Sequence, residues 1–218
     1  MDERAVSDLQ ALRERDEQLS EDSSRLRDVE LAVTAIRRRA EAIVAELGAF
    51  PAELERLSTA AVEAADELGR RQATAEATAQ DLEGEHDDET RQRLERAATR
   101  AFERAGDASR RFERATAAVE QLEGDTAELP AELATLRLEA LALAEAAPVL
   151  GAPEPGTDGL IAWASRAQAE LFVEVGQLDR QRDNVIREAN ELASMLLGEP
   201  TYGSTVAQAV DRVERAQR

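Results

Sequence analysis

Every seventh residue from Ala5 to Leu82 is apolar, and a second run of this kind extends from Leu94 to Leu150. With 43% apolar residues in the chain, twelve hits in twelve at some phase are expected by chance roughly three times in ten thousand. Heptad spacing is typical of helices that meet along a narrow seam, so both runs predict coiled-coil helices. The first run is Ala5, Leu12, Leu19, Leu26, Val33, Ala40, Leu47, Leu54, Ala61, Leu68, Ala75 and Leu82, and the second is Leu94, Ala101, Ala108, Ala115, Leu122, Leu129, Leu136, Leu143 and Leu150.

The register fails between the two runs, because continuing the first would require Glu89 and Arg96 to be apolar. The interval contains Gly84 within the acidic stretch 83–89. A change of register at a glycine flanked by acids indicates a reversal of chain direction. We therefore predict an all-α fold whose residues 1–147 form an elongated antiparallel coiled-coil hairpin with its tip near residues 84–88. Residue numbers on facing positions should sum to about 172, which places Leu68 near Ala105.

Composition and the later part of the chain fit the same architecture. Only 3% of the residues are aromatic, and helices that meet along narrow seams need few large side chains. Residues 148–159 contain three prolines and three glycines, which predicts a linker. Residues 160–218 then predict a third long helix packed on the base of the hairpin, and a short C-terminal helix.

Both arms of the hairpin contain a potential interruption, at residues 48–51 and 124–130. Gly48 and Gly124 are typical helix-ending residues, and Pro51 and Pro130 cannot donate a backbone hydrogen bond. The seven-residue phase survives Pro51, which favours a kink over a reversal there. Two interpretations stay open: a joint in a two-stranded arm, or the ends of shorter helices in a bundle.

The N-terminal segment differs from the rest of the seam, because Asp16 and Ser23 stand where a dry core would have apolar residues. Residues 1 to about 20 also extend past the returning arm. Leu9, Leu12 and Leu19 would then have no partner from it, which predicts self-association through this segment. The alternative is that the last helix covers the leucines with its own apolar face, Val206, Val210 and Val213.

Charge restricts the partners. The net charge is −19, with 27 basic and 46 acidic residues and no lysine. Nucleic acid and anionic membranes need positive potential and are therefore not expected as partners. The short clusters Arg37–Arg39, Arg70–Arg71 and Arg110–Arg111 are interpreted as solvated helix faces paired with nearby acids.

The chain has few residues for catalysis. It lacks cysteine, has one histidine, His86, and contains no GxxxxGK[ST], GxGxxG, HExxH or GxSxG motif. Glu83-x-x-His86 is one half of a di-metal carboxylate site, but no second histidine exists to complete it. We therefore expect a protein that is not an enzyme, with no catalytic residues, no cofactor, no metal and no small-molecule substrate.

Three other features of the sequence bear on a binding role. The tip carries seven acidic or histidine side chains, Asp81, Glu83, Glu85, His86, Asp87, Asp88 and Glu89. These could bind a divalent cation, but their spacing is not that of an EF-hand, and a solvated turn in which Asp87 or Asp88 caps the next helix is favoured. Trp163 with Leu160, Ile161 and Phe172 is expected to be core, and Tyr202 is given no role beyond packing.

These observations predict a structural or scaffolding protein that associates with itself or with another helical protein. The generic hairpin also resembles the arms of chromosome-segregation and repair ATPases, which separate ATP-binding heads from a tip. That resemblance implies an arm acting with separate heads, since the head motifs are missing here. A cation-binding helical bundle is a third hypothesis. No signal peptide is visible in Met1–Ala5, so we expect a cytoplasmic protein.

Overall fold

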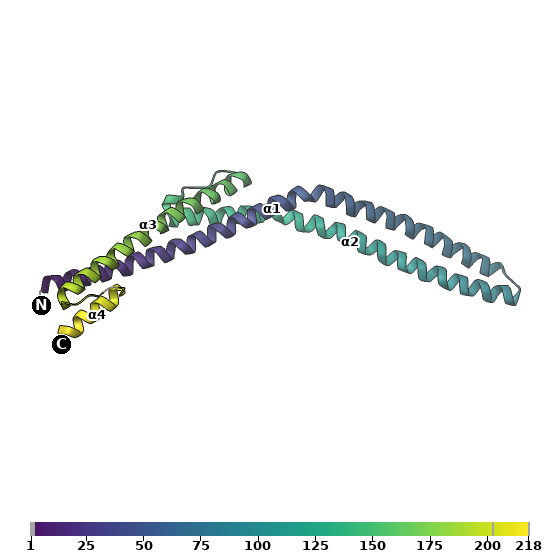
Figure 1. Cartoon of the computed structure of the whole chain (residues 1–218). Coiled ribbons are helices and arrows are strands. Elements are labelled where there is room, and N and C mark those ends of the chain that lie inside the picture. The colour runs from purple at the N-terminus through teal and green to yellow at the C-terminus, as the bar shows by residue number, and fades with distance from the viewer. Residues whose placement is uncertain (1–2, 202, 218) are drawn as a thin grey trace. The chain divides into compact units, whose positions relative to one another are not determined.

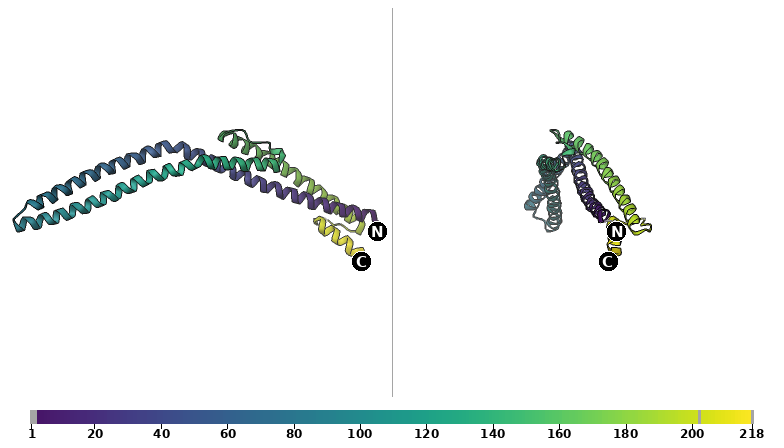
Figure 2. Two further views of the ribbon diagram at one scale, coloured as in Figure 1. Left: turned by 180° about the vertical axis from the view of Figure 1, so that it is seen from behind. Right: turned by 90° about the vertical axis from the view of Figure 1, so that its left-hand side faces the viewer.

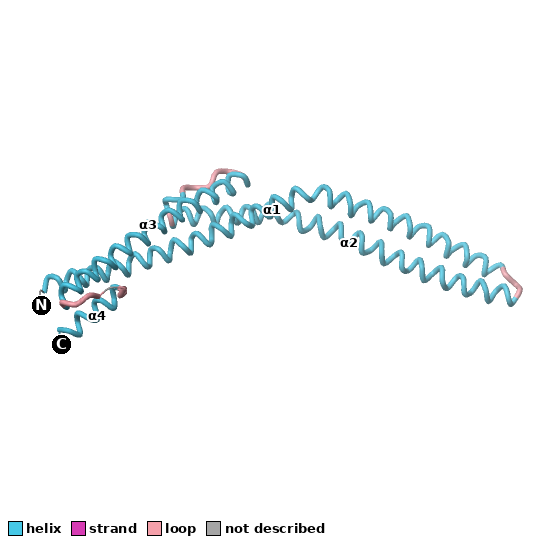
Figure 3. Tube along the Cα trace, in the orientation of Figure 1, coloured by secondary structure: helices cyan, strands magenta, loops and turns pink. Residues whose placement is uncertain are grey.

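The structure is a computed structural model that describes residues 3–201 and 203–217, and these residues form α-helices with short connections. The elements are α1 (Glu3–Gly84), α2 (Asp88–Ala146), the 3-10 helix η1 (Pro148–Leu150), α3 (Thr157–Leu197) and α4 (Val206–Gln217). The described residues contain no β-strand, and Figure 3 shows how short the loops are. The all-α prediction is therefore confirmed.

The chain divides into two compact units. Unit 1 comprises Met1–Glu41 and Ala134–Arg218, and unit 2 comprises Ala42–Leu133. Helices α1 and α2 each contribute to both units, whereas η1, α3 and α4 belong to unit 1.

Unit 2 contains the second half of α1 and the first part of α2, which lie side by side (Figures 1 and 2). The chain turns between them at residues 85–87. Arg71 on α1 lines the same groove as Arg100 and Ala101 on α2, and these positions have numbers that sum to about 172. The buried residues are mostly alanines, whose small side chains let the helix backbones approach closely; the buried apolar residues of this unit are Ile43, Ala75, Ala98, Ala101, Ala108 and Leu129.

The helices do not end at the predicted interruptions. Pro51 lies inside α1 and Pro130 inside α2, so the interpretation of these sites as ends of shorter helices is wrong. A glycine ends a helix by adopting positive φ, and neither Gly48 nor Gly124 does so. Each proline removes one backbone hydrogen bond from a helix that continues on both sides, and the long flanking segments hold the helix together across the gap.

The N-terminal part of α1 is covered within unit 1. Leu9, Leu12 and Leu19 are at most 9% exposed and belong to one apolar cluster with residues of α3 and α4. Its other members are Val185, Ala189, Ala193, Val206, Ala209, Val210 and Val213. The cluster contains no residue of α2, the returning arm. The alternative, coverage by the last helix, is confirmed, and α3 contributes to the same cluster. Because Leu9, Leu12 and Leu19 are buried, they give no reason to expect self-association through this segment.

Polar pairs join α1 to α3 at successive levels of unit 1. They are Asp16 with Arg182 (2.8 Å), Ser23 with Asp179 (3.1 Å) and Thr34 with Gln168. The numbers rise along α1 as they fall along α3, so the two helices run antiparallel. The polar residues that interrupt the N-terminal seam thus have polar partners on α3.

The end of α3 and the start of α4 follow common capping rules. Gly198 adopts the left-handed conformation (φ 70°), and its N–H donates to Ser194 O at 2.9 Å. Thr205 and Gln208 form a reciprocal capping box at the start of α4, with bonds of 3.1 and 3.3 Å. No helix among the described residues is long and apolar enough to cross a membrane.

Candidate functional site

The acidic tip is built from backbone hydrogen bonds to carboxylates. Glu85 Oε1 accepts from the N–H groups of His86 and Asp87 at 2.8 and 2.9 Å. Asp87 Oδ2 accepts from the N–H of Thr90 at 3.0 Å, and Asp87 O accepts from the N–H of Arg91 at 2.8 Å. Asp87 is therefore the N-cap of α2, and the carboxylates of Glu85 and Asp87 both stabilise the turn.

The same hydrogen bonds set the electrostatics of the tip. The amide of Thr90 holds the pKa of Asp87 below its ordinary value, because it stabilises the ionised carboxylate. Among residues 3–201 and 203–217, no group of three or more His, Asp or Glu side chains is arranged to hold a metal ion. The seven polar side chains of the tip are thus close in sequence but do not converge on one point.

Trp163 is buried in unit 1, as predicted, but not all of the residues expected to form the core with it are buried. The indole is 1% exposed, and its Nε1–H donates to the carbonyls of Leu150 and Gly151 at 3.2 and 2.8 Å. These bonds tie η1 and the start of the Pro/Gly segment to α3. Leu160 is also buried, whereas Phe172 is 74% exposed, so the prediction that Phe172 is core is wrong. Tyr202 lies outside the described residues.

An apolar groove lies between α1 and α2 in unit 1. Its volume is about 590 Å³, and it is lined mainly by Ala32, Ala35, Ile36, Leu136, Ala142 and Leu143. Arg39 on α1 and Glu139 on α2 are its charged lining residues. Leu31 and Leu138 stand one helical turn before Ala35 and Ala142, and they are 69% and 67% exposed. Each of the two helices that form the groove thus carries one exposed leucine within the same stretch of sequence as its lining residues.

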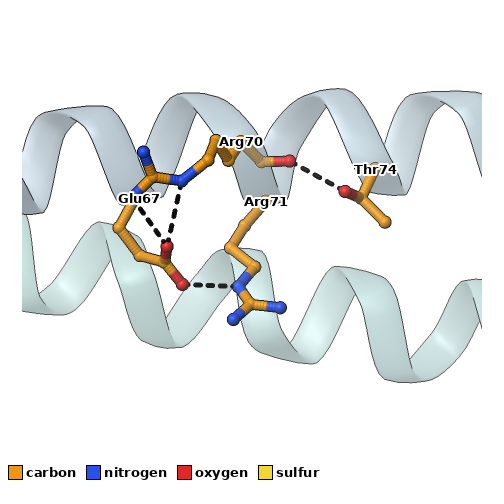
Figure 4. A network of polar contacts seen from close by, with 4 residues as sticks. All are labelled: Glu67, Arg70, Arg71 and Thr74. Carbon is orange, nitrogen blue, oxygen red and sulfur yellow. Dashed lines mark hydrogen bonds and ion pairs between the residues drawn. The ribbon is translucent and has the colours of Figure 1, made fainter.

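A second groove, in unit 2, is basic. It has a volume of about 290 Å³ and presents Arg71 on α1 with Arg100 and Arg104 on α2. Arg71 Nε donates to Glu67 Oε1 at 2.6 Å, and the other oxygen of Glu67 accepts from Arg70 (Figure 4). The pKa of Glu67 is lowered by these two guanidinium groups, chiefly by Arg71.

The sequence predicted this arrangement only in part. The expectation that short arginine clusters pair with nearby acids is confirmed for Arg37, Arg70, Arg71 and Arg110. Arg100 and Arg104 were not singled out, and within the described chain neither forms an ion pair or a side-chain hydrogen bond. The signal that could have identified them is the four-residue spacing of Arg96, Arg100 and Arg104 along one face of α2.

Comparison of the chain with protein-family models, with curated proteins and with solved structures finds no match. No relative therefore suggests a substrate or a partner. The function has to be inferred from the residues of this chain and the surfaces they form.

Proposed function

We propose that the protein is a non-enzymatic structural or scaffolding protein. In this proposal α1 and α2 form an elongated antiparallel coiled-coil hairpin, α3 packs on its base, and the protein acts by presenting helical surfaces to a partner. The heptad runs and the reversal at residues 85–87 support the hairpin. Small-angle scattering of the intact chain would test it, because a compact bundle has a much shorter maximum dimension.

The observation that carries the partner-binding role is the apolar groove of unit 1. It is lined by alanine, isoleucine and leucine, and the two helices that form it also carry Leu31 and Leu138, which expose about two thirds of their surface. Covering the exposed part of each leucine contributes about 1–2 kcal/mol. A helix laid along the groove would cover both.

A second copy of the chain is the occupant that the groove fits. The groove is lined mainly by apolar side chains from both helices. A two-fold symmetric contact places the same apolar surface against itself, so each copy would cover the groove of the other. This version of self-association uses the groove, and the buried N-terminal leucines take no part in it.

Sedimentation equilibrium tests this contact. The wild-type chain should sediment as a dimer, and the variant with Leu31→Glu and Leu138→Glu should sediment as a monomer with unchanged helix content. Val62→Glu with Phe102→Glu is the matched control, because Val62 and Phe102 are also exposed but lie in unit 2. A monomeric wild type, or a dimer that tolerates the groove variant, would contradict the self-association.

The alternative function is that of an arm resembling those of chromosome-segregation and repair ATPases. The two side-by-side helices of unit 2, joined by a tight turn, favour it. An arm acts only with separate ATP-binding heads, so the chain should co-purify in a fixed ratio with an ATPase when both are expressed together. Unchanged elution of the two proteins would exclude this alternative for the ATPase tested.

A further inference from the structure

The basic groove of unit 2 combines open space with positive charge. Ala101 is 8% exposed at its floor, and the short side chain of Ala97 leaves the space above α2 unfilled. Arg71 reaches the groove from α1, and Arg100 and Arg104 reach it from α2. Arg71 is at least 29 positions from the other two arginines in the sequence, yet all three line one groove of about 290 Å³.

The charges of this groove are only partly compensated. Glu67 is shared between Arg70 and Arg71, so a single carboxylate neutralises two guanidinium groups (Figure 4). Arg100 and Arg104 have no acidic partner among the described residues. Between Arg93 and Arg104, α2 carries four arginines and two glutamates, which makes this segment locally basic in a chain of net charge −19.

This arrangement acts against the stability of the helix itself. Arg96, Arg100 and Arg104 follow one another at four-residue intervals, and like charges at that spacing repel each other. Elsewhere on the same helix, Arg91, Arg93 and Arg110 each form an ion pair with an acid three or four positions away. Glu103 and Asp107 have the same spacing from Arg100 and Arg104, but among the described residues no ion pair joins them. A local arrangement that opposes the fold is expected where the residues serve a binding role.

We propose that this groove is an oxyanion site that takes a phosphate group, either free or carried on a small molecule. A guanidinium group presents a planar set of donors that matches the oxygens of phosphate, and a charge-assisted bond of this kind is stronger than a neutral one. The hydroxyls of Thr74 and Thr78 already donate to backbone carbonyls. The arginines are therefore the donors to the anion.

The size and the surroundings of the groove select the class of ligand. A compact group with two negative charges matches the two unpaired guanidinium groups and fits a volume of about 290 Å³. An extended polyanion such as nucleic acid would also meet the acidic surface on either side of the groove, where the net charge of −19 repels it.

Calorimetric titration of the full chain at low ionic strength tests the site. The probes are inorganic phosphate and phenyl phosphate, with chloride at equal ionic strength as the reference. We expect saturable binding of one phosphate group per chain. The double variant Arg100→Gln and Arg104→Gln should lose affinity by about tenfold or more, because each removed guanidinium takes away a charge-assisted bond.

The double variant Arg111→Gln and Arg114→Gln is the matched control. It removes the same charge from exposed positions of the same helix outside the groove, so it should bind phosphate as the wild type does. Tighter binding of phenyl phosphate than of inorganic phosphate would identify a phosphate carried on a small molecule, and the reverse would identify the free ion.

Two results would overturn the proposal. One is equal loss of phosphate affinity in both double variants, which would show general charge screening. The other is the absence of saturable binding by wild-type protein whose circular dichroism shows an intact helical fold.

Discussion

The two units hold their helices together by different means. In unit 1, α1 and α3 combine large apolar residues such as Leu9 and Leu171 with polar pairs such as Asp16 and Arg182. In unit 2, between residues 47 and 130, all of which are described, every side-chain hydrogen bond and ion pair joins positions at most four apart. The buried residues of that stretch are mainly alanines.

The difference concerns how each unit fixes its register. If α1 slipped by one turn against α3, Asp16 and Arg182 would each lose their charged partner, and a polar seam residue of this kind specifies the alignment. An alanine seam looks similar before and after a slip, so it specifies the alignment only weakly. The alignment of unit 2 therefore depends on the turn at residues 85–87.

The largest loss of stability is expected from a substitution in the core of unit 1. Trp163→Ala removes a side chain that is 1% exposed and the two hydrogen bonds of its indole. The free energy of unfolding should fall by about 3–5 kcal/mol, measured by urea denaturation. Phe172→Ala is the control, because Phe172 is 74% exposed, and it should change stability by less than about 0.5 kcal/mol. Equal losses in both variants would contradict the assignment of Trp163 to the core.

A smaller loss of stability is expected when the polar pair of Asp16 on α1 and Arg182 on α3 is broken. Asp16→Ala should lower the unfolding free energy by about 1–2 kcal/mol, a reduced figure because the Arg182 side chain is 41% exposed. Replacing both residues by leucine should recover most of the loss, since no unpaired charge then remains. A double-mutant cycle measures the coupling, and strictly additive losses would show that the pair does not interact.

The heptad pattern was sufficient to predict the all-α class, because helical periodicity depends on local sequence. It was not sufficient to place Leu9 and Leu12, since their cover comes from α3 and α4, far along the chain. Pro51 and Gly48 were interpreted from local propensity, which the flanking helix overrides. The basic groove was missed because Arg71 and Arg100 meet only after the chain has turned.

The register of unit 2 gives the third prediction. The chain has no native cysteine, so Leu68→Cys with Ala105→Cys should form a crosslink on mild oxidation. Because alanine seams tolerate slippage, the pair Leu68→Cys with Ala101→Cys should also crosslink, more slowly. The corresponding one-turn shift in unit 1 is tested at the Ser23–Asp179 contact, which leaves Asp16 and Arg182 in place. Ser23→Cys with Asp183→Cys should crosslink far less than Ser23→Cys with Asp179→Cys. Equal slippage in both units would remove the difference between them. Efficient crosslinking of Val33→Cys with Ala61→Cys would instead place the reversal at Pro51.

The smallest change in stability is expected from substitutions in the turn at residues 85–87, which sets the alignment of the helices in unit 2. The hydrogen bond from the Thr90 amide lowers the pKa of Asp87. The ionised carboxylate of Asp87 therefore stabilises the fold fully at a pH above the pKa of an unfolded aspartate. This stabilisation is lost as the pH falls through the lowered pKa of the folded protein. Asp87→Ala should therefore reduce the thermal stability of the helices at neutral pH and matter less in acid. Asp87→Asn keeps a capping side chain without a titrating carboxylate, so its stability should change less with pH than that of the wild type. Thermal unfolding followed by circular dichroism at neutral and acidic pH measures the three proteins. A difference between wild type and Asp87→Ala that is the same at both pH values would show that the carboxylate of Asp87 does not cap α2.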